Sequence, residues 1–335
     1  MLILIYNLSV FRQFHTIIHS FFQKGRPVLH FQPVSLEQKQ KIENYLYRYG
    51  ENSCQHSFVA MYCMEAKYQD MVCEQDGWLF TLRYGKSTDT HRVYLFPLGD
   101  TNDMDGLRNA LAAILNDAHE NHCGVRFETI TENAAMLLNE LYPNQFDIEA
   151  SRDWYEYIYN FNTLANLPGG KLASKRYDIQ TFFRDYEGRA VIRTIQPNDI
   201  DGILRFQQAW LTEKQHIDED VQLDYENLAI RKGLAHYKEL GLSGIVVFID
   251  DELCGYAYGA PLSDTAYDVI IEKGDRHYAD IYKILNRELV RLCCDGFAYI
   301  NREEDAGVEG LRKAKLSYKP DILLEKFIAQ EKVVS

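Results

Sequence analysis

Long apolar runs are missing from this sequence. No stretch of about 18 or more apolar residues occurs, so the chain is predicted to have no transmembrane helix. Spacings typical of metal ligands, of phosphate-binding P-loops and of the Gly-x-Ser-x-Gly turn of hydrolases are missing too. Metalloenzyme, NTPase and hydrolase functions therefore have no support, and no metal ion is expected.

Cysteine pairs with the spacing of a zinc site are also lacking. The seven cysteines form no Cys-x-x-Cys pair, and the adjacent Cys293 and Cys294 cannot sensibly bridge to each other within a helix. Reduced, buried cysteines are typical of a reducing compartment. We therefore expect a cytoplasmic protein, with a peripheral position at the membrane left open.

Acidic residues are absent from the first 36 positions, which hold Arg12, Lys24, Arg26 and many apolar residues. A signal peptide places its charge before its apolar run, whereas here the apolar run comes first. Three interpretations remain, namely a membrane-touching helix, a helix packed on the body, and an extension from an upstream start codon. We favour the last two and treat residues 1–30 as an N-terminal extension.

An excess of positive charge is lacking as well. The formal net charge is −13, which argues against a protein that coats nucleic acid without specificity. A local basic groove remains compatible with this total, because phosphate binding depends on local charge.

Length and element order predict two similar domains. A chain of 335 residues is longer than one ordinary core requires. By apolar periodicity each half contains a helix, three strands, a helix, a strand, a helix and a strand, which predicts mixed α/β sheets. We place the domains at 31–165 and 189–335, joined by a connector at 166–188. A strand at 154–161 then belongs to the first domain, and one at 322–330 closes the second.

Three segments resemble a single protein family. They are Tyr49-Gly50-Glu51-Asn52-Ser53 with His56-Ser57-Phe58, Gly170-Lys171-Leu172 with Lys175-Arg176, and Asn301-Arg302-Glu303-Glu304-Asp305 through Tyr318-Lys319-Pro320. Together they are similar to an uncharacterised bacterial family that belongs with the C-terminal catalytic domain of phosphatidylglycerol lysyltransferase.

The resemblance implies both a fold and an activity. The fold would be two tandem GCN5-related N-acetyltransferase (GNAT) units, shared with the Fem aminoacyltransferases. The better-known relatives take an aminoacyl group from aminoacyl-tRNA and pass it to an amine or hydroxyl of a lipid or peptide. A lipid, peptide or small-molecule acceptor would then be the partner of this chain.

A carboxylate cluster follows the apolar run at 297–300. It consists of Glu303, Glu304 and Asp305. In a partly desolvated cleft a carboxylate can take the proton of an attacking amine or hydroxyl, and strand ends are where ligands gather. Ordinary solvated acids near a helix N-terminus are the alternative. Glu303 and Asp305 are the preferred catalytic candidates, with Tyr318 as a candidate acid unless it merely packs in its helix.

Basic residues gather in the connector and in the last helix. The candidates are Lys171, Lys175, Arg176, Arg312, Lys315 and Lys319. If the two halves share one groove, these side chains would bind the phosphates of tRNA, whereas singly each is more typical of a solvated surface. The segments that carry the resemblance add Asn52, His56, Asn301 and Arg302 as substrate-binding candidates, although a lone histidine is more often a satisfied loop residue.

The turn that binds coenzyme A is missing. Acetyltransferases of the GNAT fold hold its pyrophosphate on a Gln/Arg-x-x-Gly-x-Gly/Ala turn at a helix N-terminus. The corresponding residues, 272–279, keep only Gly274, and Asp275 would repel phosphate. Coenzyme A is therefore less expected than aminoacyl-tRNA, and no cofactor is predicted.

The leading hypothesis is an acyltransferase that uses aminoacyl-tRNA. An acyl-coenzyme A-dependent N-acyltransferase is the first alternative. A catalytically inactive, ligand-binding pair of GNAT units is the second.

Overall fold

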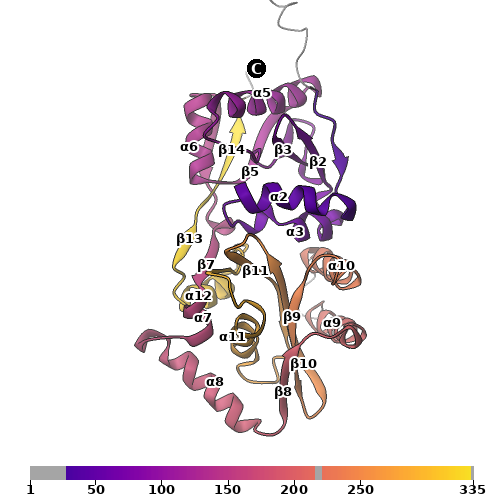
Figure 1. Cartoon of the computed structure of the whole chain (residues 1–335), viewed down its shortest axis with the longest axis vertical. Coiled ribbons are helices and arrows are strands. Elements are labelled where there is room, and N and C mark those ends of the chain that lie inside the picture. Colours follow the sequence, from indigo (N-terminus) through magenta and orange to yellow (C-terminus); the bar gives the residue numbers. More distant parts are fainter. Residues whose placement is uncertain (1–27, 216–220, 333–335) are drawn as a thin grey trace, which may run out of the picture.

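The computed structural model describes residues 28–215 and 221–332, which form two sheets stacked along the long axis of the molecule (Figure 1). The interpretation of residues 1–30 as an extension falls almost entirely outside the described residues. Within them, no helix combines the length and the apolar character needed to cross a bilayer.

The first sheet has seven strands in the order β1-β2-β3-β4-β5-β14-β6. Its strands are β1 (Gln32–Pro33), β2 (Asp70–Gln75), β3 (Trp78–Arg83), β4 (His91–Tyr94), β5 (Gly124–Thr131), β6 (Phe146–Ala150) and β14 (Lys326–Glu331). The α-helices of this half are α2 (Lys39–Tyr49), α3 (Phe58–Cys63), α4 (Glu65–Tyr68), α5 (Met104–Glu120) and α6 (Glu132–Leu141). Only β4 and β5 run parallel to each other, because α5 crosses over between them.

The second sheet also has seven strands, in the order β13-β7-β12-β11-β10-β9-β8. Its strands are β7 (Glu156–Asn160), β8 (Ala190–Thr194), β9 (Ser243–Ile249), β10 (Glu252–Pro261), β11 (Ala266–Gly274), β12 (Tyr299–Asn301) and β13 (Ile322–Leu324). The α-helices are α7 (Phe161–Asn166), α8 (Ala173–Asp185), α9 (Ile200–Gln215), α10 (Val221–Ala235), α11 (Ile281–Cys293) and α12 (Glu309–Ser317). Helices α9 and α10 lie on the opposite side of the sheet from α11 (Figure 1).

The two halves of the chain exchange strands. Strand β7 comes from the segment that we placed in the first domain, yet it pairs with β12 and β13 of the second sheet. The run predicted as one strand at 322–330 divides at Glu325, so that β13 joins the second sheet and β14 inserts between β5 and β6 of the first. The sheets therefore do not follow the boundaries at 31–165 and 189–335.

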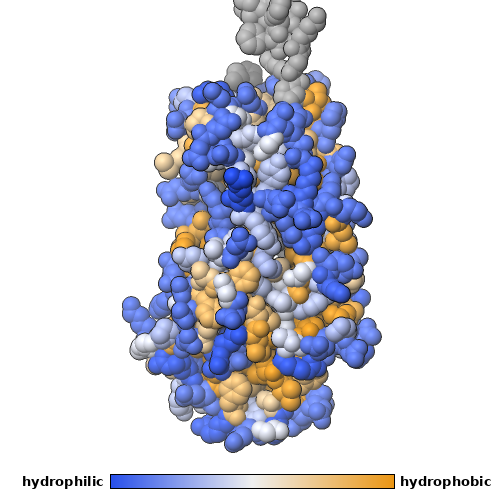
Figure 2. All heavy atoms as spheres, in the orientation of Figure 1, coloured by the Kyte–Doolittle hydropathy of each residue, from blue (hydrophilic) through white to orange (hydrophobic). Residues whose placement is uncertain are grey.

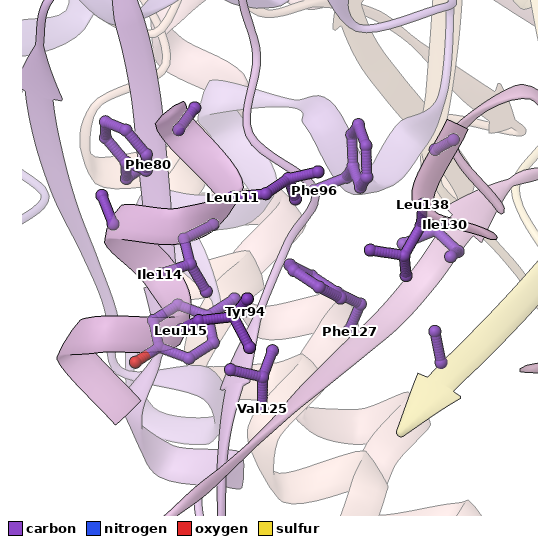
Figure 3. Close-up of a cluster of buried hydrophobic side chains, with 14 of the residues drawn as sticks. Phe80, Tyr94, Phe96, Leu111, Ile114, Leu115, Val125, Phe127, Ile130 and Leu138 are labelled. Atoms are coloured by element: carbon purple, nitrogen blue, oxygen red, sulfur yellow. The ribbon is translucent and has the colours of Figure 1, made fainter. Parts of the chain in front are cut away.

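Three apolar clusters hold this arrangement together. One lies between the first sheet and helices α5 and α6, with Phe80, Phe96, Ile114 and Phe127 among its buried side chains (Figure 3). A second packs α11 on the other sheet. The third joins α2 and α3 to α9 and α10 and to strands β9 and β10. Because burial of apolar area is the main stabilising term in folding, the third cluster makes the two halves one body.

The two halves differ in surface character. On the face shown in Figure 2, the half that contains the first sheet is covered mostly by hydrophilic residues, whereas hydrophobic residues are more frequent over the second sheet.

Candidate functional site

The parallel strands β11 and β12 diverge in the middle of the second sheet. They pair only where Ala266–Asp268 meets Tyr299–Asn301. Strand β11 continues to Gly274 while the chain leaves β12, and we call the resulting opening the fork. Glu303 lies just beyond β12 with a φ of 57°, which is uncommon for a residue other than glycine and recurs at functional positions. Ligands of open α/β sheets bind beyond the carboxyl ends of the strands.

A buried carboxylate, Glu156 of β7, ties the fork to the first half of the chain. Its Oε1 accepts hydrogen bonds from Ser53 Oγ (2.8 Å) and Lys326 Nζ (2.8 Å). Its Oε2 accepts from the Cys54 backbone N–H (2.9 Å) and from Asn301 Nδ2 (2.6 Å). Burial favours the neutral acid, but Lys326 and these donors outweigh that effect and lower the pKa of Glu156. Glu156 is therefore ionised and fully paired.

Three further carboxyl groups lie at the fork near the ion pair of Glu156 and Lys326. With Glu156 they form what we call the inner carboxyl cluster: Glu156, Asp268, Glu303 and Glu304. Burial, together with the negative charges of Asp268 and Glu304, raises the pKa of Glu303 well above its usual range, although Lys315 opposes the shift. Burial and the charges of Glu156 and Glu304 raise the pKa of Asp268 in the same way. The fork thus holds protonatable carboxyl groups whose pKa values are shifted toward neutrality, as a general base requires.

The buried amine of Lys315 closes the fork from the α12 side. Its Nζ donates to the backbone carbonyl of Arg302 (2.5 Å) and to that of Glu304. Burial lowers the pKa of Lys315. On the other side, the Cys54 thiol lies 3.5 Å from Glu304 Oε2, and burial raises the pKa of that thiol. Lys315 was predicted to bind substrate phosphates, but the structure instead places it beneath the loop that carries the cluster.

Asp305 is separated from the cluster by its own set of partners. Its side chain is 0% exposed and accepts from Tyr157 OH (2.5 Å), Arg312 Nε (2.8 Å), Arg152 NH1 (3.2 Å) and the Gly307 backbone N–H (3.0 Å). Burial opposes ionisation, but the hydrogen bonds from Arg312 and Tyr157 prevail and lower the pKa of Asp305. A carboxylate so fully engaged is suited to hold the loop rather than to accept a proton.

Replacing Asp305 with asparagine is expected to lower the free energy of unfolding by about 2 kcal/mol, since hydrogen bonds to charged groups are worth roughly 1.5–3 kcal/mol. Because folding lowers the pKa of Asp305, its stabilisation is present above the usual aspartate pKa and is lost as the pH falls. Urea unfolding at neutral and at acidic pH measures both effects. Asp153→Asn is the matched control, since Asp153 also pairs with Arg312 but is 61% exposed. Equal effects of the two variants would contradict the assignment.

Arg302 and Tyr318 come together on the side of the sheet that faces α11. Arg302 NH2 lies 2.6 Å from Glu272 Oε2, and its guanidinium is 5.2 Å from the centre of the Tyr318 ring. Lys175 Nζ lies 4.6 Å from the same ring centre. Burial, followed by the positive charge of Lys283, lowers the pKa of Lys175, while burial raises that of Tyr318 to about 12. Two of the predicted cations thus share one aromatic platform.

The other predicted cations do not join that platform. Arg176 donates to the Leu167 and Gly169 carbonyls and so braces the connector. Arg312 is engaged by Asp305 and Asp153. Lys171 and Lys319 are exposed. The structure therefore groups Lys175 with Arg302 but distributes the remaining basic residues over several surfaces.

The loop between α2 and α3 contacts both halves. Asn52 accepts from Ser263 Oγ through Oδ1 (2.7 Å) and from Asn301 Nδ2 through its backbone carbonyl (2.9 Å). His56 faces the other way, with Nδ1 3.2 Å from the Gly50 carbonyl, and lines a pocket between the segment that follows β4 and the end of β5. Burial lowers the pKa of His56 to about 4, so the imidazole is neutral at physiological pH.

Sequence reasoning missed Glu156, Asp268 and Lys326. Each is an ionisable residue inside an otherwise apolar or aromatic run, and each is 0% exposed. Charged residues are almost never fully buried unless they are paired or functional. That signal was present in the sequence, but it could not show that residues so distant in the chain converge.

The N-terminus of α11 carries acids where a coenzyme A pyrophosphate would sit in the GNAT fold. Asp280 precedes the helix in a left-handed conformation and pairs with Lys283 Nζ (2.5 Å). Asp275 Oδ1 accepts from the His277 backbone N–H (2.9 Å). Negative side chains already occupy the end of the helix that favours anions, so this turn is poorly suited to a diphosphate.

Comparisons with known proteins place this geometry in context. A family model described as phosphatidylglycerol lysyltransferase, C-terminal, matches residues 47–330. A conserved protein of unknown function from Bacteroides thetaiotaomicron has a similar structure, with a TM-score of 0.85 at 26% identity, covering 91% of this chain and 100% of that one.

Two other solved structures are more distant. L-PGS from Bacillus licheniformis gives a TM-score of 0.64 at 16% identity and covers 91% of this chain and 94% of its own. FemX gives 0.60 at 8% identity, covering 91% and 98%. At these identities the likeness shows the fold. The mixed α/β class and the tandem acetyltransferase-like architecture predicted from the sequence are confirmed.

Proposed function

This chain belongs to the phosphatidylglycerol lysyltransferase C-terminal family, and we propose that it is an acyltransferase that moves an aminoacyl group from aminoacyl-tRNA to an amine or hydroxyl acceptor. The observation that carries the proposal is Glu303 at the fork, a carboxyl group with a raised pKa at the end of a parallel strand. The proposed place of action is the cytoplasm, peripherally at the membrane where the acceptor is a lipid.

The proposed step is direct acyl transfer. The acceptor nitrogen or oxygen attacks the carbonyl carbon of the aminoacyl ester, and the new C–N or C–O bond forms as the ester C–O bond to the tRNA ribose breaks. Glu303 takes the proton of the acceptor and returns it to the departing ribose oxygen. General base catalysis by such a group is most effective when its pKa lies near the working pH. No covalent enzyme intermediate is required.

The donor is inferred from two sets of charges. Lys175, half-buried beside the Tyr318 ring, offers a cation for the phosphates at the end of a tRNA. Asp275 and Asp280 at α11 disfavour the pyrophosphate of coenzyme A. These features support aminoacyl-tRNA over the alternative of an acyl-coenzyme A donor. The acceptor class, which is a lipid, a peptide or a small molecule, stays part of the proposal.

Transfer from charged tRNA tests the proposal. The protein is incubated with a radiolabelled aminoacyl-tRNA pool and a cell extract that supplies acceptors, and label leaving the tRNA fraction for lipid or peptide is counted. We expect transfer, together with no saturable binding of coenzyme A in calorimetry. Saturable coenzyme A binding without transfer would favour the acyl-coenzyme A alternative, and neither result would favour an inactive binding module.

A further inference from the structure

Asp268 is a buried carboxyl group at the fork that receives no hydrogen bond from the described part of the chain. The residue is 0% exposed, and neither Oδ1 nor Oδ2 has a hydrogen-bond partner among the described residues. Most buried side-chain polar atoms have a partner, and an unpaired carboxylate is far more costly to bury than a neutral group. A carboxyl group with two open oxygens therefore points to a partner that comes from outside the chain.

The position of Asp268 on β11 directs its side chain toward the other members of the inner carboxyl cluster. Asp268 is paired with Asn301 of β12, and directly paired residues project from the same face of a sheet. Asn301 uses that face to bind Glu156 and the backbone of Asn52. The negative charge of Asp268 contributes to the raised pKa of Glu303, so the two carboxyl groups influence each other.

Neither of the two lysines beside this cluster donates a hydrogen bond to Asp268, although the positive charge of Lys315 acts on it. The amine of Lys326 is engaged by Glu156 and Ser53. The amine of Lys315 donates to two backbone carbonyls. The fork is thus an acidic site in which the described residues supply no donor to Asp268.

We propose that Asp268, together with Glu303 and Glu304, binds a primary ammonium group of the substrate. The inference rests on the proposed function, since both the aminoacyl group of a charged tRNA and an amine acceptor carry such a group. A primary ammonium offers three N–H donors, which matches the open oxygens of Asp268 and a neighbouring carboxylate. In the described residues no set of three or more His, Cys, Asp or Glu is arranged to hold a metal ion.

Binding of the ammonium group is coupled to the release of a proton by the protein. Burial and the surrounding negative charges favour the neutral forms of Asp268 and Glu303 in the free protein. An incoming ammonium favours their ionised forms. The protein must therefore release a proton when the ammonium binds, and the affinity must rise with pH until that carboxyl is ionised in the free protein.

Calorimetric titrations with small amines test the site directly. Glycinamide represents the α-ammonium of an aminoacyl group, n-butylamine represents an amine acceptor, and N-acetylglycinamide is the neutral comparison. We expect saturable binding of at least one of the two amines, none of the neutral amide, and proton release when the titration is repeated in buffers of different ionisation enthalpy. The stronger of the two amines identifies the source of the ammonium.

Asp268→Asn is expected to weaken amine binding by about 10- to 100-fold, because it removes a hydrogen bond to a charged group, and to reduce proton release. Asp264→Asn, at an exposed position of the preceding turn, is the matched control and should bind as the wild type does. Glu304→Gln provides a second reduction if Asp268→Asn folds poorly, which thermal unfolding reports.

The outcomes separate this inference from the proposed function. Unchanged amine binding and proton release in Asp268→Asn, or equal binding of the neutral amide, would overturn the ammonium site even if the protein transfers aminoacyl groups. Amine binding that depends on Asp268 in a protein that transfers nothing would keep the site and remove the proposed reaction.

Discussion

Replacing Lys326 with methionine is expected to lower the free energy of unfolding by about 3–5 kcal/mol, the usual range when one partner of a buried ion pair is removed. Lys326 Nζ lies 2.8 Å from Glu156 Oε1 and 2.6 Å from Ser53 Oγ, and both members of the ion pair are almost completely buried. Methionine fills a similar volume but leaves Glu156 without its cation, and urea unfolding measures the loss.

The size of this effect follows from where the pair lies. Lys326 belongs to β14 of the first sheet and Glu156 to β7 of the second, so the ion pair joins the two strands that the halves exchange. Lys332→Met is the matched control because its pair with Asp147 is largely exposed, and it should change stability by less than about 1 kcal/mol.

A second variant separates lost charge pairing from lost packing. In the double variant Glu156→Gln with Lys326→Met neither position of the ion pair carries a charge, so it should be more stable than Lys326→Met alone. If both proteins are equally destabilised, packing of the lysine side chain rather than compensation of Glu156 holds the strands.

Local patterns in the sequence were sufficient for most elements but not for the sheets. The apolar residues at helical spacing from Met104 indicate α5, and the apolar run from Trp78 indicates β3, because each signal depends on neighbours in the chain. The assignment of β7 failed because strand pairing depends on residues far away. Tyr157 and Tyr159 pack in the core of the second sheet, and nothing near them in the sequence indicates that choice.

The site was predictable to a similar degree. The carboxylates after β12 were identified because a strand that ends in charge is unusual, and Glu303 and Glu304 do lie at the fork. The different roles of the residues in that run could not be predicted. The role of Asp305 depends on its hydrogen bonds with Arg152 and Tyr157, which lie about half the chain away in the sequence. The structure therefore moves the proposed base to Glu303 and gives Asp305 a positioning role in the proposal.

Replacing Glu303 with glutamine is expected to reduce aminoacyl transfer by roughly 100- to 10,000-fold, the usual contribution of a general base. Glutamine keeps the shape and can occupy the loop, but it cannot take the proton of the acceptor. Because burial raises the pKa of Glu303, the folded protein gains nothing from its ionisation. The variant should therefore be at least as stable as the wild type near neutral pH, so lost activity would not reflect unfolding.

The pH dependence of aminoacyl transfer provides a second test of Glu303. Glu303 must be ionised to act as a base, so wild-type transfer should rise with pH through its raised pKa and then level off. The residual activity of Glu303→Gln should lack this rise. Glu309→Gln is the matched control, because Glu309 is 79% exposed and pairs with the exposed Lys313. Transfer within about tenfold of the wild type in Glu303→Gln, with the same pH profile, would show that acceptor deprotonation does not depend on this carboxyl group.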